Sequence, residues 1–334
     1  MKTIYLHIGT HKTGTTSIQH FLASNRVLLQ DLGVSYPNVR IVEKAHHVLA
    51  GQLIHDAGLT IFNKTGEIAD IDTIDMDSWH ELKQHIERTD YQHIVISSEE
   101  FEWLTVPSII PELIGEKFHF KIIVFVRRQD QYLESIYQQF IKDSATRLSL
   151  PIEDWCRNVL NNKRYHDYSI LVDRWGEVFG DDSLHVINFD DAVRDGIELT
   201  FLSVIGIDRE AAENFKVPEK TWLQRQKEGL DVGCVEFLRW SNMLDMTAEK
   251  HDSILNALME VSDRFKEKGE FEQHFLTAET RMLIMESVRD SNEKLRKKYF
   301  PDRVQMFEEP TERGEGVNLA IKRIVPYLME HWKV

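Results

Sequence analysis

The sequence predicts an α/β fold, a central parallel sheet flanked by helices, with a largely helical C-terminal portion. Short apolar runs with the length of buried strands alternate with segments of helical periodicity through residue 210. Strands that alternate with helices form parallel βαβ units and place helices on both faces of the sheet. Beyond that point the periodicity is almost purely helical. We therefore expect an α/β core over residues 1–210 and a helical extension over 211–334 that packs on it.

The first predicted element is a strand, followed by a glycine-bounded turn and a helix. Ile4, Tyr5, Leu6 and Ile8 predict a buried strand, Gly9–Gly14 is the turn, and apolar residues recur at helical spacing over Ser17–Leu32. Glycine permits a close approach of the backbone to a ligand. The first amides of a helix, and the positive end of its dipole, favour an anion. This order of elements predicts a phosphate-binding loop.

The polar residues of the turn are the candidate ligands of that phosphate. Lys12 supplies a mobile positive charge, and hydroxyl groups at the start of the helix are further donors. The residues that we expect at the phosphate are His11, Lys12, Thr13, Gly14, Thr15, Thr16 and Ser17.

Four further apolar runs complete the predicted sheet. They are Gly33–Tyr36, His93–Ser97, Ile122–Val126 and His185–Asn188. The helices predicted between the strands cover His47–Ala57, Trp79–Arg88 and about Asp130–Lys142, and the segment 59–77 is interpreted as an insertion or a hairpin. An acidic turn and a helix that runs into Leu202 and Ile205 follow the last strand. Ligands of such sheets bind beyond the carboxyl ends of the strands, so we expect Lys12, the residues after Ile96, and Arg127 at one edge.

The remainder of the chain is predicted to be helical. The expected helices are Ile152–Asn161, Asp167–Val178, Asp231–Leu244, Asp252–Lys268, Ala278–Tyr299 and Leu319–His331. We expect them to pack against the sheet and to close over an acceptor substrate, and a homodimer contact is the alternative role.

The spacing of the first loop separates two kinds of phosphate site. The NTP-binding P-loop, GxxxxGK[ST], has its lysine directly after the second glycine. Gly9 and Gly14 have the right separation and Thr16 fits the last position, but Thr15 occupies the lysine position and Lys12 lies inside the loop. The phosphate cradle is therefore kept and its lysine is moved.

This loop, GTHKTGTTSIQ, resembles the 5′-phosphosulfate loop of sulfotransferases that use 3′-phosphoadenosine 5′-phosphosulfate (PAPS). Its departure is His11, where many members of that family have proline. The family also carries the 3′-phosphate on an arginine at a strand end and on a serine eight residues later. Arg127 and Ser135 have that separation, although Arg128 stands where relatives often have Asn or Asp. A basic loop over the adenine is common in the family, and Lys220 and Arg225 are the candidates for it.

The resemblance implies the P-loop-like sulfotransferase fold, with PAPS as donor and 3′,5′-bisphosphoadenosine (PAP) as product. It implies transfer of a sulfuryl group to a hydroxyl, or an amine, of an acceptor, which we expect to be a carbohydrate or a glycolipid, in the style of bacterial and carbohydrate sulfotransferases. Lys12 would neutralise charge on the departing 5′-phosphate, and no metal is expected. Two alternatives remain: a P-loop nucleotide kinase or NTPase, and a non-catalytic nucleotide-binding protein.

Two pairs of residues are candidates for the base that removes the acceptor proton. His46 and His47 follow the second predicted strand, where carbohydrate sulfotransferases place their base, and imidazole titrates near neutral pH. Glu99 and Glu100 directly follow a central strand. For the glutamates, a helix capping box that starts at Ser97 is the structural alternative.

Composition excludes several other classes. A formal net charge of −15 disfavours nucleic acid and anionic membranes as general partners, because both reward a basic surface. Two cysteines are too few for a disulfide scaffold. No apolar run has the length of a membrane span, and the first strand begins without a leader, so we expect a cytoplasmic protein without integral membrane association.

Overall fold

A computed structural model describes residues 1–54, 77–161, 166–218, 229–311 and 324–327 of the chain. By contacts between its residues the chain divides into two compact units. The first comprises Met1–Arg127 and Tyr168–Glu219, and the second comprises Arg128–Asp167 and Lys220–Val334. The expected division at residues 210 and 211 into a core and an extension stays a prediction.

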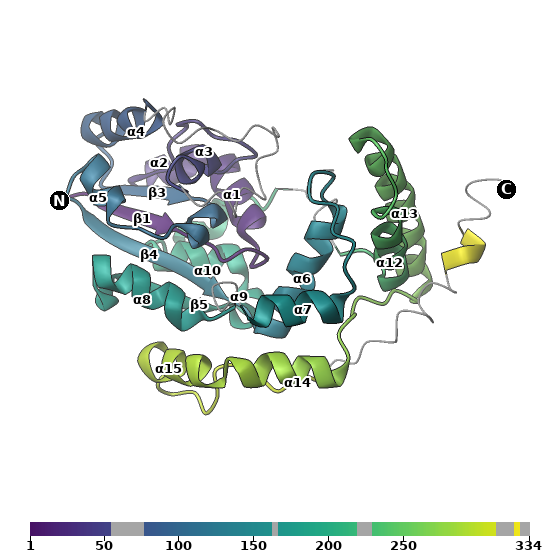
Figure 1. Cartoon of the computed structure of the whole chain (residues 1–334). Coiled ribbons are helices and arrows are strands. Elements are labelled where there is room, and N and C mark those ends of the chain that lie inside the picture. Colours follow the sequence, from purple (N-terminus) through teal and green to yellow (C-terminus); the bar gives the residue numbers. More distant parts are fainter. Residues whose placement is uncertain (55–76, 162–165, 219–228, 312–323, 328–334) are drawn as a thin grey trace. The chain divides into compact units, whose positions relative to one another are not determined.

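The first unit is built on one parallel sheet, as the alternation of strands and helices predicts (Figure 1). The five strands run in the order β2-β3-β1-β4-β5, and every neighbouring pair is parallel. Their bounds are β1 Thr3–His7, β2 Val34–Ser35, β3 His93–Ser97, β4 His119–Val126 and β5 Leu184–Asn188. The sheet confirms the predicted α/β class, and it brings the carboxyl ends of β1, β3 and β4 to one edge.

Helices cover both faces of this sheet because its strands are apolar on both sides. One face, with Tyr5, Val95 and Phe125, forms a buried core with residues of α1, α2, α9 and α10. The opposite face packs against α8, where Phe179 meets Phe120 of β4 with ring centroids 5.1 Å apart. The helical elements of this unit are α1 Thr15–Ser24, α2 Arg26–Asp31, α3 His47–Gly51, α4 Asp77–Arg88, η3 Glu99–Trp103, α5 Ile109–Ile114, α8 Tyr168–Phe179, η5 Asp181–Ser183, α9 Phe189–Asp195, α10 Ile197–Val204 and η6 Ala211–Asn214.

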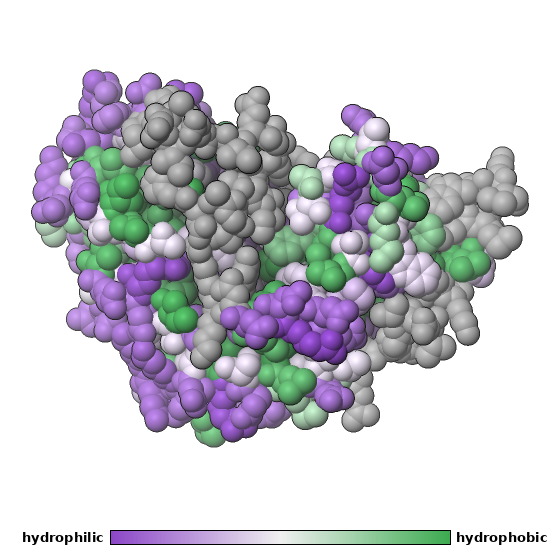
Figure 2. Space-filling model, in the orientation of Figure 1, coloured by the Kyte–Doolittle hydropathy of each residue, from purple (hydrophilic) through white to green (hydrophobic). Residues whose placement is uncertain are grey.

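Amphipathic helices of this unit follow their sequence pattern. In α4 the buried side chains are Ser78, Trp79, Leu82 and Ile86, one helical face. Its other residues are largely exposed, and Figure 2 shows a hydrophilic surface over this helix.

The second unit is helical in the part that the structure describes. Its helices are α6 Gln129–Lys142, α7 Ile152–Leu160, α12 Val232–Ser241, α13 Ala248–Lys268, α14 Ala278–Ser287 and α15 Arg289–Tyr299. A buried ion network joins α6 to α14. The Arg281 guanidinium donates to Asp130 at 2.8 Å and to both oxygens of Glu134 at 2.8 and 2.9 Å.

Four predicted elements differ from the structure. The helix expected over His47–Ala57 ends at Gly51. The helix expected over Ser17–Leu32 breaks at Asn25 into α1 and α2. The acidic turn expected after β5 is instead the helix α9, because the Asn188 side chain accepts hydrogen bonds from two amides of its first turn. The helix expected over Ala278–Tyr299 breaks at Val288 into α14 and α15. The insertion or hairpin predicted over 59–77, apart from Asp77 of α4, and most of the helix predicted over 319–331 lie outside the described residues.

Candidate nucleotide-binding site

The loop after β1 is anchored to β4 by backbone hydrogen bonds. The Thr10 amide and the Thr10 hydroxyl both donate to the carbonyl of Phe125 at 3.0 Å, and the Phe125 amide donates to the carbonyl of Gly9 at 2.7 Å. Inside the loop, the Thr13 hydroxyl donates to the Thr10 carbonyl at 2.6 Å. The start of the loop therefore continues the pairing of β1 with β4 before α1 begins.

Three residues of this loop have a positive φ: Gly9 at 99°, Lys12 at 61° and Gly14 at 74°. Such a conformation is uncommon for a residue with a side chain, and successive turns of this kind aim backbone amides into an anion-binding concavity. Gly14 also precedes α1, where it cannot cap the first turn with a side chain. A Cβ at Gly14 would lie 2.5 Å from Cδ1 of Ile197, the far end of a flexible side chain, so the positive φ is the stronger reason for glycine at this position.

Arg127 lies against this loop. Its Nη1 donates to the backbone carbonyl of Lys12 at 3.2 Å, and its guanidinium carbon stands 5.3 Å from the centre of the Phe189 ring. The Tyr168 hydroxyl donates to the Arg127 carbonyl at 2.7 Å, which holds the end of β4 in place. The two basic residues singled out by the sequence thus meet across 115 positions of the chain.

His11 occupies a buried acidic setting directly before Lys12. Its amide and its Nδ1 approach the same oxygen of Glu102, at 2.9 and 2.7 Å, and its Nε2 lies 3.7 Å from Glu100. Burial alone would lower the pKa of His11, but hydrogen bonds and charge interactions with Glu100 and Glu102 raise it to about 10. His11 is therefore a buried imidazolium at neutral pH.

The remaining polar residues of the loop and of α1 differ in their surroundings. Thr15 is buried, whereas Thr16 and Ser17 are half-buried. The Ser17 hydroxyl donates to Glu198 of α10 at 2.5 Å, so in this structure it is turned to a protein carboxylate. Contact of Thr13, Thr15, Thr16 and Ser17 with a phosphate stays a prediction.

The two candidate histidines have different environments. His46 is fully buried, its Nδ1 accepts from the Ser97 amide at 3.2 Å, and its Nε2 donates to the Pro37 carbonyl at 3.1 Å. Burial lowers the pKa of His46 to about 4. His47 is half-buried, with its Nδ1 2.9 Å from the Ser98 hydroxyl. These contacts give His46 a structural task and leave His47 the better placed candidate base.

The candidate glutamates belong to η3, directly after β3. Glu99 accepts from the Gln19 amide at 2.7 Å. Burial would raise the pKa of Glu99, but the charges of His47 and His11 and the bond from Gln19 hold it well below the usual range. The capping side chain of this turn is Ser98, which accepts from the Glu100 amide, and not Ser97, whose hydroxyl lies 2.8 Å from Nδ1 of His7.

Four other residues named from the sequence are not brought to this loop by a described contact. Arg128 is buried and bonded through Nε and Nη2 to Asp130, at 2.7 and 3.0 Å, so it serves the ion network of the second unit. Ser135 is a half-buried residue of α6 in that unit, and its part in a 3′-phosphate site stays a prediction. Lys220 and Arg225 lie outside the described residues.

Three residues at this edge were not anticipated from the sequence: Glu102, Tyr168 and Phe189. Each follows or faces a strand end, so the strand pattern could have included Glu102 and Phe189, which stand soon after β3 and directly after β5. Tyr168 had no such signal because it reaches Arg127 from α8.

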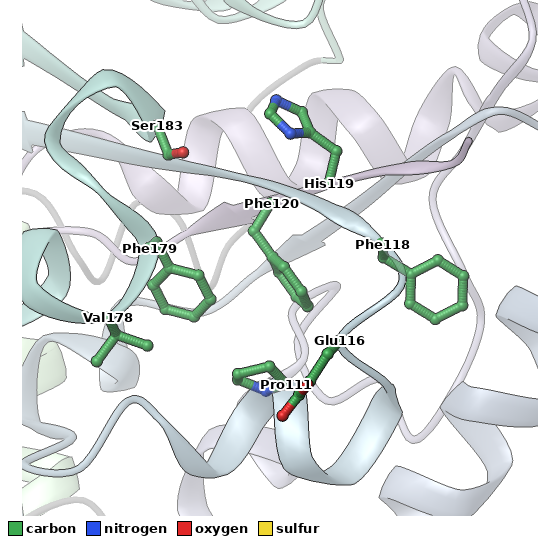
Figure 3. Close-up of a pocket in the computed structure, with 8 residues that line it drawn as sticks. All are labelled: Pro111, Glu116, Phe118, His119, Phe120, Val178, Phe179 and Ser183. Carbon is green, nitrogen blue, oxygen red and sulfur yellow. The ribbon is translucent and has the colours of Figure 1, made fainter.

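A shallow pocket of about 350 Å³ lies at the other edge of the sheet (Figure 3). Phe120 of β4 points toward Phe179 of α8 in this pocket, and Phe118, directly before β4, is a further lining residue. The pocket lies at the first residues of β4, and the loop after β1 contacts the last ones. Each residue of a strand adds about 3.3 Å, so this pocket is separate from the candidate nucleotide-binding site.

Four large aromatic side chains are buried. Trp103, Trp155, Trp175 and Tyr132 are at most 6% exposed.

Among the described residues, no group of three or more His, Cys, Asp or Glu side chains could hold a metal ion. None of the helices in that part of the chain combines the length and hydrophobicity of a bilayer span.

No family model matches the chain. An uncharacterized protein of Archaeoglobus fulgidus is 26% identical over 211 residues, which cover 62% of this chain. The match spans 54% of that relative, so the chain corresponds to about half of its length.

Two solved structures with coarse similarity to the chain are sulfotransferases. A sulfotransferase from Alicyclobacillus acidocaldarius has a TM-score of 0.43 and 14% identity, over 73% of this chain and 94% of its own. Mouse sulfotransferase SULT7A1, complexed with PAP, has a TM-score of 0.39 and 15% identity, over 80% of this chain and 88% of its own. Neither similarity assigns an activity to this chain.

Proposed function

We propose that the protein is a PAPS-dependent sulfotransferase. The observation that carries the proposal is the hydrogen bond from the Arg127 side chain to the carbonyl of Lys12. It joins the loop that resembles the 5′-phosphosulfate loop to the arginine that resembles the 3′-phosphate ligand. A donor with phosphate groups at both its 5′ and 3′ ends needs positive charges, and this chain, with a net charge of −15, has Lys12 and Arg127 on segments that touch at one sheet edge.

The chemistry follows from the residues of that edge. The acceptor oxygen forms a bond to sulfur while the bond between sulfur and the 5′-phosphate oxygen breaks, and the acceptor proton passes to a base. Lys12 would neutralise the charge that grows on the leaving phosphate oxygen, and amides of the left-handed loop would hold that phosphate. Arg127 would bind the 3′-phosphate through its guanidinium.

We assign the base to His47. His46 has both ring nitrogens bonded to backbone groups, and Glu99 is a buried carboxylate whose low pKa makes it a weak base. His47 begins α3, and the amide of the preceding residue donates to the Ser97 carbonyl at 2.8 Å, which ties that helix to the end of β3. Glu100 is the second candidate.

The acceptor class rests on the resemblance to carbohydrate sulfotransferases, and we propose a hydroxyl of a carbohydrate or glycolipid. The NTPase alternative requires a lysine at position 15, where this chain has Thr15. A cytoplasmic location and a homodimer are further expectations.

Calorimetric titration with PAP in the absence of magnesium tests the donor. We expect binding that Lys12→Ala and Arg127→Ala each weaken roughly 10- to 100-fold, since each removes a charge-assisted contact worth about 1.5–3 kcal/mol. Arg194→Ala is the matched control because Arg194 is 66% exposed on α9. Tight binding of Mg-ATP with no preference for a 3′-phosphate would overturn the proposal in favour of an NTPase.

Transfer is tested by mass spectrometry of cell extracts incubated with PAPS and the protein. We expect products heavier by one sulfuryl group that disappear with Lys12→Ala and fall strongly with His47→Gln. PAP binding without any such product, over a broad set of extracts, would favour the non-catalytic alternative.

A further inference from the structure

The turn that follows β3 presents an electrostatic difficulty for a phosphate site. Glu99, Glu100 and Glu102 of η3 stand beside the loop, and carboxylates repel a phosphate. A Cβ at Gly9 would lie 3.2 Å from the Cα and Cβ of Glu99, which shows how closely the two segments approach. Some group must offset this negative charge before an anion can bind.

His11 contacts two of these glutamates and acts on the third through its charge. It is 3% exposed, it bonds to Glu102 through both its amide and its Nδ1, and Glu100 lies 3.7 Å from its Nε2. Its charge also acts on Glu99, where it helps to keep that carboxylate ionised. The centre of its ring lies 5.5 Å from that of the buried Trp103.

The bond from the His11 amide has a second effect. Because Glu102 holds the backbone directly before Lys12, it restrains the left-handed conformation that Lys12 adopts. Glu102 is in turn fixed by Arg174, whose Nη2 donates to its carbonyl at 2.7 Å. The loop is thus held from η3 on one side and by Arg127 on the other.

We propose that His11 is a positioning residue of the phosphate-binding loop: its imidazolium is the counter-ion that allows the glutamates of η3 to stand beside an anion site, and its bonds to Glu102 hold the backbone of Lys12. This inference rests on the proposed function. It also explains how this loop works with a histidine where the sulfotransferase loops it resembles often have proline. The ionisable groups around His11 are Glu99, Glu100, Glu102, Lys12 on its own loop, and Arg174 and Tyr168 beyond Glu102.

The first test measures the charge of His11 without any cofactor. Nitrogen-detected NMR of the imidazole, assigned by the signal lost in His11→Gln, should show an imidazolium at pH 8 in the wild type. In Glu102→Gln we expect a neutral ring at that pH, because burial then acts with less opposition. A neutral His11 in the wild type at pH 8 would overturn the proposal, whatever the protein binds.

The second test measures PAP affinity as a function of pH. Titration of PAP itself affects both proteins equally, so we compare the PAP affinity of the wild type divided by that of Glu102→Gln. We expect this ratio to rise at least about tenfold between pH 5.5 and pH 8.5, because the variant loses its imidazolium over that range. Glu112→Gln, at an exposed residue of α5, should give a ratio near one at every pH. A flat ratio for Glu102→Gln contradicts the proposal.

Variants that do not fold are recognised by circular dichroism. If Glu102→Gln fails to fold, His11→Gln keeps a hydrogen-bond donor toward Glu102 and removes only the charge, and it should weaken PAP binding about tenfold at pH 7. Unchanged affinity in His11→Gln would refute the role. Absence of PAP binding by the wild type would instead count against the proposed function, and the NMR result would still decide the charge of His11.

Discussion

At the scale of single residues, three buried histidines at this sheet edge have opposite protonation states. Burial lowers the pKa of His7 and of His46 to about 4, and only Glu99 opposes this at His7. His11 is equally buried, but Glu100 and Glu102 raise its pKa to about 10. The difference depends on whether a carboxylate or a neutral group meets the ring.

These histidines predict how stability depends on pH. The unfolded chain binds protons to His7 and His46 more strongly than the folded chain does, so stability falls as pH decreases from about 6.5 toward 4. Each shift corresponds to up to about 3 kcal/mol at full effect. His11 has the opposite sign: its contribution is complete below about pH 6.5 and is lost as pH rises toward 10. We expect maximal stability near pH 6.5.

Urea unfolding at a series of pH values measures this curve. In His46→Gln the side-chain amide still offers one acceptor and one donor to the two backbone groups, and the loss of stability below about pH 6.5 should become smaller. His80→Gln, on the exposed side of α4, should leave the pH dependence unchanged. If the free energy of unfolding of His46→Gln fell as steeply below about pH 6.5 as that of the wild type, groups other than His46 would cause the decrease.

The sequence predicted part of this edge. Lys12 and Arg127 were found because each stands at a strand end with a motif spacing, and the structure brings them together. The sequence could not predict which of His46 and His47 has a structural role. That difference depends on the backbone groups of Pro37 and Ser97, which bond to the ring of His46.

At the scale of elements, Asn25 decides where the first helix ends. The side-chain NH₂ group of Asn25 donates to the carbonyls of Phe21 and Lys216, both at 2.8 Å. Its side-chain oxygen accepts from the backbone amide of Lys216 at 3.0 Å. The apolar periodicity continues through this position, so the pattern alone predicted one helix. A contact with a residue 191 positions away overrides it.

Replacing Asn25 with alanine tests this explanation. Asn25→Ala should lower the free energy of unfolding by about 1–3 kcal/mol, because it leaves the backbone groups of Lys216 without their partner. Asn38→Ala, at an exposed loop residue, should change it by less than about 0.5 kcal/mol. A gain in stability for Asn25→Ala would mean that helix propensity outweighs the contacts.

At the scale of the whole molecule, the chain passes between the two units three times, after residues 127, 167 and 219. Periodicity could predict the helices of the second unit but not this interleaving, since unit membership depends on long-range contacts. Those contacts include the Arg281 network, in which one fully buried guanidinium meets Asp130 and Glu134 of α6.

Removing that guanidinium should destabilise the second unit. Arg281→Leu removes the buried cation that Asp130 and Glu134 share, although Asp130 keeps its bonds from Arg128. We expect a cost of about 3–5 kcal/mol and faster hydrogen exchange in α6 and α14. Arg289→Leu removes an ion pair with Glu286 whose side chains are 71% and 57% exposed, and should cost no more than about 1 kcal/mol. Equal effects of the two variants would contradict a structural role for the network.

The bond between Arg127 and Lys12 has a consequence for synthesis of the protein. The loop leaves the ribosome more than a hundred residues before Arg127, and its other anchors, Glu102 and Phe125, also follow late. Contacts between distant residues form only after the chain between them has closed, and a growing chain cannot close what has not yet emerged. The nascent chain therefore lacks its candidate nucleotide site until β4 has paired with β1, so the nucleotide cannot act as an early folding template.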